Sequence, residues 1–286
     1  MHFVFTMRKT VIILSIFALI AGSCGQTTNK QEQAETANNE EIVCEDEKQT
    51  DEVELDMRVI PQFPEGSNIK TNVEISLSHD DDRERESFKS MLSEEWYDFY
   101  QDSITKKYFL KKADIRIESY YNDCWGDSVK YIKSQRKPLI FVKGIIPQNE
   151  EIFSIPVTKR RVWVGEKYSF SFNEKTYIFR GDGNTIKSEM AHTDDGLERW
   201  DEVKNYKLYL SEEGKAEQLI LAIPTFEHNF MKILWIGDLD GDGKPDFILD
   251  TSRHYEEETV LLFLSSKAGS GEIVRIVASS SYGFAC

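Results

Sequence analysis

Residues 235–249 read Trp-Ile-Gly-Asp-Leu-Asp-Gly-Asp-Gly-Lys-Pro-Asp-Phe-Ile-Leu. Apolar runs at 230–236 and 247–249 flank a loop that is rich in aspartate and glycine. Short apolar runs with aromatic and β-branched residues are typical of strands, whereas Asp-Gly sequence favours a tight turn. The stretch therefore predicts two strands joined by an acidic loop, which is a late hairpin of a β-rich body.

The spacing of the acids in this loop predicts a metal site. Counted from the first aspartate, positions 1, 3, 5 and 9 are occupied by Asp238, Asp240, Asp242 and Asp246. Alternate residues of a tight loop direct their oxygens toward one centre, and Gly243 at position 6 permits the positive φ that closes the loop. Lys244 at position 7 offers its backbone carbonyl. Ca²⁺ takes six to eight such oxygen ligands, so we expect Ca²⁺, with a solvated acidic turn as the alternative.

The core Asp-x-Asp-Gly-Asp-Gly-x-x-Asp-apolar resembles the calcium loop of FG-GAP/VCBS repeats. The resemblance covers about residues 232–264 and implies a hairpin stiffened by Ca²⁺. One copy does not make a propeller, because a propeller needs several blades. An EF-hand is excluded, since position 12 is Leu249 and no helical pattern follows.

Outside this loop, strand patterns dominate from residue 113 onward, and they are separated by short polar intervals. The predicted strands are residues 72–77, 113–119, 139–143, 162–164, 168–172, 176–179, 206–210, 219–223, 230–236, 247–249, 260–264 and 273–277. Asn173 and Glu174 are expected to form a hairpin turn. Apolar residues at helical spacing predict one helix over residues 84–101. The expected fold is a mainly β, antiparallel body with one or two helices, and not a complete propeller.

The N-terminus is typical of a secreted lipoprotein. Arg8 and Lys9 precede a largely apolar run at 11–21, which is too short to span a bilayer as a permanent helix. Ala21-Gly22-Ser23-Cys24 resembles a bacterial lipobox, which implies cleavage after residue 23 and lipidation of Cys24. An ordinary cleaved signal peptide is the alternative. Gly25 is not the aspartate that directs enterobacterial lipoproteins to the inner membrane, so the outer membrane is favoured.

Three cysteines remain if Cys24 is lipidated, namely Cys44, Cys124 and Cys286. An oxidising compartment favours one disulfide. Cys124 lies in folded-looking sequence and is the expected partner, with Cys286 preferred over Cys44 as its mate. Three free thiols remain the alternative.

Composition divides the chain and excludes several functions. Residues 1–23 are the expected signal peptide, and residues 24–56 form an acidic tether that lacks the apolar residues needed for a core. The body is divided into 57–150, a mixed region with one helix and strands, and 151–286, an antiparallel β region with the acidic loop. A single domain over 57–286 is the alternative. Net charge is −15 for the whole chain, which argues against nucleic-acid binding. No His-Glu-x-x-His, phosphate-binding loop or Gly-x-Ser-x-Gly motif occurs.

The sequence thus predicts a cell-envelope lipoprotein with a structural Ca²⁺ site and a non-enzymatic binding or scaffold role. Its expected partners are a calcium ion, the membrane through Cys24, and a protein or glycan that the sequence leaves unidentified. The alternative is a secreted hydrolase that uses a pair of carboxylates which sequence spacing cannot identify.

Overall fold

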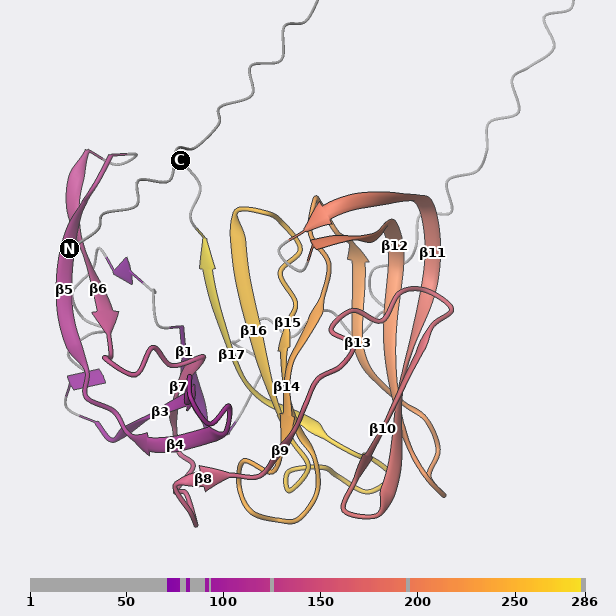
Figure 1. Ribbon diagram of the computed structural model, residues 1–286, viewed down its shortest axis with the longest axis horizontal. Coiled ribbons are helices and arrows are strands. Elements are labelled where there is room, and N and C mark those ends of the chain that lie inside the picture. The colour runs from indigo at the N-terminus through magenta and orange to yellow at the C-terminus, as the bar shows by residue number, and fades with distance from the viewer. Residues whose placement is uncertain are drawn as a thin grey trace, which may run out of the picture. The chain divides into compact units, whose positions relative to one another are not determined.

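The predicted hairpin lies inside a five-stranded antiparallel sheet, called here the central sheet. Its order is β17 (Arg275–Gly283), β16 (Glu257–Leu264), β15 (Asp246–Asp250), β14 (Lys232–Gly237) and β9 (Ser154–Ile155). The computed structural model describes residues 71–77, 81–82, 91–92, 94–123, 126–193 and 196–283. In space, the central sheet lies in the middle of the described part of the structure (Figure 1).

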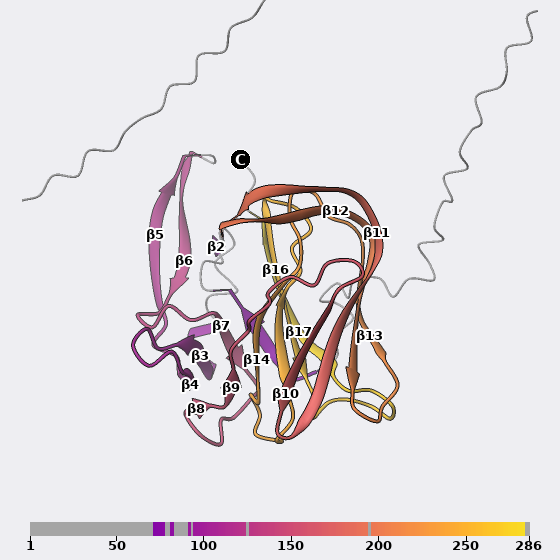
Figure 2. The ribbon, with the colours of Figure 1, turned by 45° about the vertical axis from the view of Figure 1, so that its right-hand side comes forward.

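A second antiparallel sheet, called the hairpin sheet, consists of β10 (Lys167–Phe172), β11 (Lys175–Thr193), β12 (Gly196–Glu212) and β13 (Gln218–Thr225). β10 pairs with β11 only as far as Arg180, and β13 pairs with β12 only from Lys204. Residues 185–193 and 196–203 therefore pair with each other alone and form a two-stranded arm. The arm bends across the top of the molecule in Figures 1 and 2.

Two further sheets precede these in the chain. The N-terminal sheet has the order β1 (Glu74–Ser76), β7 (Ile140–Lys143), β3 (Trp96–Gln101), β4 (Tyr108–Lys112) and β8 (Glu151–Ile152). A small sheet contains β2 (Asp81–Asp82), β6 (Asp127–Lys133) and β5 (Arg116–Asn122). β8 belongs to the N-terminal sheet and β9 to the central sheet, so the chain passes between the two sheets within a few residues.

The core has two main parts, one on each face of the central sheet. Successive residues of a strand point to opposite faces, and β15 buries both. Phe247 and Leu249 join a cluster with Phe179 and Leu208 of the hairpin sheet. Ile248 joins a second cluster with Phe99, Leu110 and Val142 of the N-terminal sheet. A strand buried on both faces has no polar face, which explains the uninterrupted apolar run after the acidic loop.

The expected fold class is confirmed, because the described residues form antiparallel sheets and none of these sheets closes on itself. The hairpin turn is also confirmed, with Asn173 and Glu174 both at positive φ. The predicted helix over residues 84–101 is wrong at its C-terminal end, where Trp96–Gln101 is β3. Trp96 packs on one face of this strand and Phe99 on the other. Burial of both faces gave apolar spacing that imitates a helix.

Strand boundaries differ from the predictions elsewhere. Residues 162–164 form only an isolated bridge, Val164 with Gly181. β4 was not predicted, and β6 and the arm have too many polar residues to be recognised by alternation. Residues 180–182, Arg-Gly-Asp, look like a turn in sequence but lie within β11. A Cβ on Gly181 would lie 2.3 Å from the carbonyl oxygen of Trp163, so glycine is required for close packing there.

Several predictions fall on residues outside the described ranges. These are the signal peptide, Cys24, the tether over 24–56, Cys44, Cys124 and Cys286. They stay predictions, as does the division of the body near residue 150. In the part of the chain that is described, no helix has the length and apolarity needed to cross a membrane.

Candidate metal centre

The acidic loop, residues 238–245, connects β14 to β15 at one end of the central sheet. Gly241 and Gly243 adopt φ values of 79° and 81°, which an L-residue rarely adopts, so the two glycines allow the loop to fold back on itself. The loop is also attached to neighbouring elements. Asn173 Nδ2 donates to the carbonyl of Gly243 at 2.7 Å, and Gln148 Nε2 donates to the carbonyl of Asp240 at 3.3 Å.

Three of the predicted ligands converge. Asp238, Asp240 and Asp246 each offer one carboxylate oxygen, and the three oxygens lie within 4.8 Å of one another. Asp246 is fully buried, and the other two are partly buried. Oδ1 of Asp240 is buried and has no hydrogen-bond partner among the described residues. A buried acceptor without a donor is costly, and a cation placed between the three carboxylates would satisfy it. The residues present therefore fit a metal ion.

Asp238 also organises the backbone of the loop. Its Oδ1 accepts hydrogen bonds from the amides of Gly241 and Asp242 at 2.8 and 3.0 Å, and its Oδ2 accepts from Gly243 at 2.9 Å. These bonds hold the loop in the conformation that brings the acids together. An aspartate at position 238 is therefore needed to fold the loop, in addition to the negative charge that it contributes.

The two remaining predicted ligands are placed differently. The Asp242 carboxylate accepts from the hydroxyl of Ser265 at 2.9 and 3.0 Å and from the amide of Lys244 at 2.9 Å. Asp242 is not part of the three-aspartate cluster. A ligand role for Asp242 and for the carbonyl of Lys244 stays a prediction.

Two serines complete the surroundings of the cluster, and the sequence reading missed both. Ser265 donates its amide to Asp246 Oδ1 at 2.8 Å, and the hydroxyl of Ser266 donates to Asp240 Oδ2. They follow β16, which runs antiparallel to β15 and therefore ends beside the start of β15. A serine pair directly after β16, the second strand that follows the loop, was the available signal.

Burial and mutual repulsion define the electrostatics of the cluster. Burial raises the pKa of Asp246 well above its ordinary value, and the nearby Asp240 raises it further, against hydrogen bonds from Ser265 and Leu239. Burial also raises the pKa of Asp240, with additional contributions from the charges of Asp242 and Asp238. A bound dication would reverse both effects, because it favours the ionised carboxylates. Oxygen donors of this kind suit hard cations such as Ca²⁺ and Mg²⁺.

Comparison with known proteins found no matching family model, no matching curated protein and no matching solved structure.

Proposed function

We propose that this chain is a cell-envelope lipoprotein whose β-rich body is stabilised by one Ca²⁺ at the aspartate cluster, and which acts by binding and not by catalysis. The proposal is carried by the convergence of Asp238, Asp240 and Asp246, together with the buried Oδ1 of Asp240, which has no hydrogen-bond partner among the described residues. The FG-GAP/VCBS-like spacing favours Ca²⁺ over Mg²⁺. Ca²⁺ also accepts a flexible shell of six to eight oxygens, whereas Mg²⁺ demands near-octahedral geometry and retains its waters.

The ion would act as a structural link in the central sheet. Asp238 follows β14, Asp246 begins β15, and Asp240 contacts Ser266 beyond β16. A cation bound to all three carboxylates would therefore connect the ends of three neighbouring strands. At a free Ca²⁺ concentration about 100 times the dissociation constant, linkage predicts about 2.7 kcal/mol of added stability.

The test is thermal unfolding of the purified full chain in EDTA, in millimolar Ca²⁺ and in millimolar Mg²⁺. Wild type should melt at the highest temperature in Ca²⁺. Asp240→Asn should lose most of the Ca²⁺-dependent increase, yet be as stable as wild type or more stable in EDTA, because it removes one repelling charge. This opposite response in the two conditions separates a metal ligand from a residue needed only for folding.

Asp123→Asn is the matched control, because it makes the same chemical change at an exposed position outside the loop. Its response to Ca²⁺ should equal that of wild type. Equal melting of wild type in Ca²⁺ and in EDTA would reject the metal site and leave the alternative of an acidic turn.

The lipid anchor is a separate part of the proposal and rests on the sequence 21–24 alone. Acyl chains on Cys24 would hold the chain at the membrane, with about 0.8 kcal/mol contributed by each buried methylene. Mass spectrometry of the mature N-terminal peptide measures this directly. An N-terminus without acylation would contradict the anchor and leave the Ca²⁺ proposal unaffected.

A further inference from the structure

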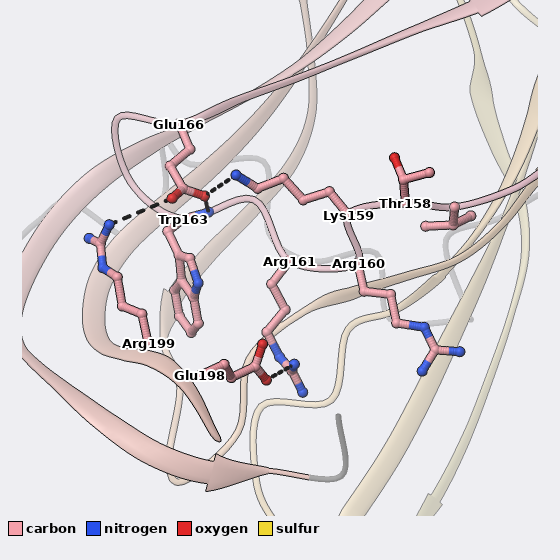
Figure 3. Close-up of a pocket in the computed structure, with 9 residues that line it drawn as sticks. Thr158, Lys159, Arg160, Arg161, Trp163, Glu166, Glu198 and Arg199 are labelled. Carbon is pink, nitrogen blue, oxygen red and sulfur yellow. Dashed lines mark hydrogen bonds and ion pairs between the residues drawn. The ribbon is translucent and has the colours of Figure 1, made fainter. Parts of the chain in front are cut away.

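The arm contacts the body of the protein through β12. Glu198 pairs with Arg161. Arg199 Nη1 lies 3.6 Å from Glu166 Oε1. Figure 3 shows both contacts, and their partners belong to the segment between β9 and β10. β12 is thus the inner strand of the arm, and β11 is the outer strand, as Figures 1 and 2 show.

The outer edge of β11 is an unpaired strand edge. Among the described residues, β11 pairs with β12 alone beyond Asp182. Residues 187–193 pair with residues 196–202 without a register shift, so this part of the strand is regular. Residues 184–190 are all exposed. A regular exposed edge presents N–H and C=O groups at the spacing that another strand requires.

The side chains along this edge have an order that is complementary to itself in reverse. Ile186 and Met190 are apolar, yet they are 55% and 62% exposed. Ile186 has no partner on β12, because the register shifts at this residue. Between the two apolar residues, Lys187 Nζ lies 2.6 Å from Glu189 Oε2, and both side chains are more than half exposed. Residues 186–190 therefore read apolar, cationic, polar, acidic, apolar.

We propose that β11 pairs antiparallel with β11 of a second copy of this chain, centred on Ser188, so that two arms form one four-stranded sheet. In this register Lys187 faces Glu189 of the second copy. Ile186 likewise faces Met190 of the second copy. Opposite charges and apolar residues that face each other across two strands stabilise the pairing. The interface has a twofold axis, so each of these contacts occurs twice.

The charges also fix the register and favour a second copy over other strands. Moving the centre by one residue places Glu189 opposite its own copy, or Lys187 opposite its own copy, and like charges in this position are destabilising. A uniformly basic or acidic partner strand would leave one of the two residues opposite a like charge. The proposal does not depend on Ca²⁺, because none of these residues belongs to the acidic loop.

Sedimentation velocity of the purified full chain, from low to high micromolar concentration, measures the association. The mass should rise from that of one chain to that of two, and the profiles in EDTA and in Ca²⁺ should agree. Agreement of the two profiles separates the result from the metal proposal. A mass of one chain at every concentration would overturn the proposal.

Charge exchange at the interface is the decisive test. Lys187→Glu places acids opposite acids, and Glu189→Lys places lysines opposite lysines, so each variant alone should associate about tenfold or more weakly than wild type. An equimolar mixture of the two variants should form a dimer with one chain of each, because opposite charges again face each other. Lys130→Glu makes the same charge change at an exposed position outside the arm and should associate as wild type does.

Unchanged melting temperatures would show that the variants are folded. Either variant associating alone as wild type does would overturn the proposal and place any dimer contact elsewhere on the chain. A mixture that stays monomeric would also overturn it.

A disulfide between copies tests the register itself. Residues that face each other in an antiparallel pair have Cα atoms about 4.5–5.5 Å apart, which lies within the range of about 4.4–6.8 Å for disulfides. Ser188→Cys should therefore form a link between the two copies at position 188 under mild oxidation, identified by mass spectrometry of non-reduced peptides. Glu202→Cys is the matched control, because this exposed residue lies on β12, away from the interface. No link with Ser188→Cys, or an equal yield with Glu202→Cys, would overturn the proposed pairing.

Discussion

Glu212, the last residue of β12, shows how one carboxylate couples stability to pH. The residue is buried, but its two oxygens contact Lys175 Nζ and Lys215 Nζ, each at 2.6 Å. Burial alone would raise the pKa of Glu212. The hydrogen bonds and charges of the two lysines outweigh burial, and the pKa is lowered from its ordinary value of 4.5. Because the folded pKa lies below the unfolded one, ionised Glu212 stabilises the fold above pH 4.5, and this contribution is lost as the pH falls through the folded pKa.

Glu212→Gln should therefore lower the free energy of unfolding at pH 7 by about 1–3 kcal/mol, the usual range for hydrogen bonds to charged groups. The difference from wild type should be smaller at pH 3.5 than at pH 7, because pH 3.5 lies below the unfolded pKa and the stabilisation by the ionised carboxylate decreases as the pH falls toward the folded pKa. Urea unfolding at the two pH values measures it, with the exposed neighbour variant Glu213→Gln as the control. A deficit of the same size at both pH values would show that the charge of Glu212 is not the cause.

The convergence of three residues of the candidate metal centre could be predicted because their positions depend on local spacing. Asp238, Asp240 and Asp246 lie within one tight loop, and the structure brings them together. Ser265 and Ser266 could not be identified, since their place beside the loop depends on the register between β15 and β16. Asp242 has the correct spacing, but its carboxylate bonds to Ser265. Local spacing thus predicts which carboxylates converge better than it predicts the groups that hydrogen-bond to them.

The β10–β11 hairpin turn is the element that connects the hairpin sheet to the acidic loop. Phe172 pairs with Lys175 across a two-residue turn, in which Asn173 has φ 45° and Glu174 has φ 67°. Positive φ at both positions is typical of a type I′ turn, which favours glycine at the second position. Asn173 suits the first position and also donates to the Gly243 carbonyl. Glu174 is the residue that does not suit the turn.

Glu174→Gly should raise the free energy of unfolding by a few tenths to about 1 kcal/mol, because a residue with a Cβ costs about 1–2 kcal/mol in this conformation and glycine loses part of that gain to its more flexible unfolded state. Glu174→Ala removes the carboxylate but keeps the Cβ, so it should not be stabilising. Urea midpoints of the three proteins decide the matter. Equal stabilisation by alanine and glycine would assign the effect to charge instead of backbone conformation.

Elements were predictable where one strand face is polar or where a turn has characteristic residues, as for the hairpin with Asn173 and Glu174. Prediction failed where apolar residues on both faces of a strand imitate helical spacing and where neither face is apolar. β3 belongs to the first case and was read as part of a helix. The arm belongs to the second, since Ile186, Met190 and Leu197 are exposed among charged residues. Its pairing depends on backbone hydrogen bonds between β11 and β12, which leave no apolar period in the sequence.

At the scale of the whole molecule, the central sheet supplies one face to each of the two main core clusters. The described residues all belong to one compact unit, Glu54–Cys286. Ile248 and Leu249 are neighbours on β15, yet Ile248 packs with the N-terminal sheet and Leu249 with the hairpin sheet. If either cluster loosened alone, it would expose one face of a sheet that the other cluster needs intact. The two clusters should therefore unfold together, whether or not a sequence division exists near residue 150.

Ile248→Ala and Leu249→Ala test this coupling from the two sides of a single strand. Both side chains are fully buried, and each truncation should cost about 2–5 kcal/mol. Each variant should still unfold in one transition, with tryptophan fluorescence and far-ultraviolet circular dichroism coinciding. Ile248→Val, with an expected cost of about 0.5–1.5 kcal/mol, serves if the alanine variant does not fold. The opposite result would be an Ile248 variant that unfolds in two transitions, with the earlier one accounting for only part of the fluorescence or circular-dichroism change. It would show that the N-terminal sheet is a separate domain and would support the division at residue 150.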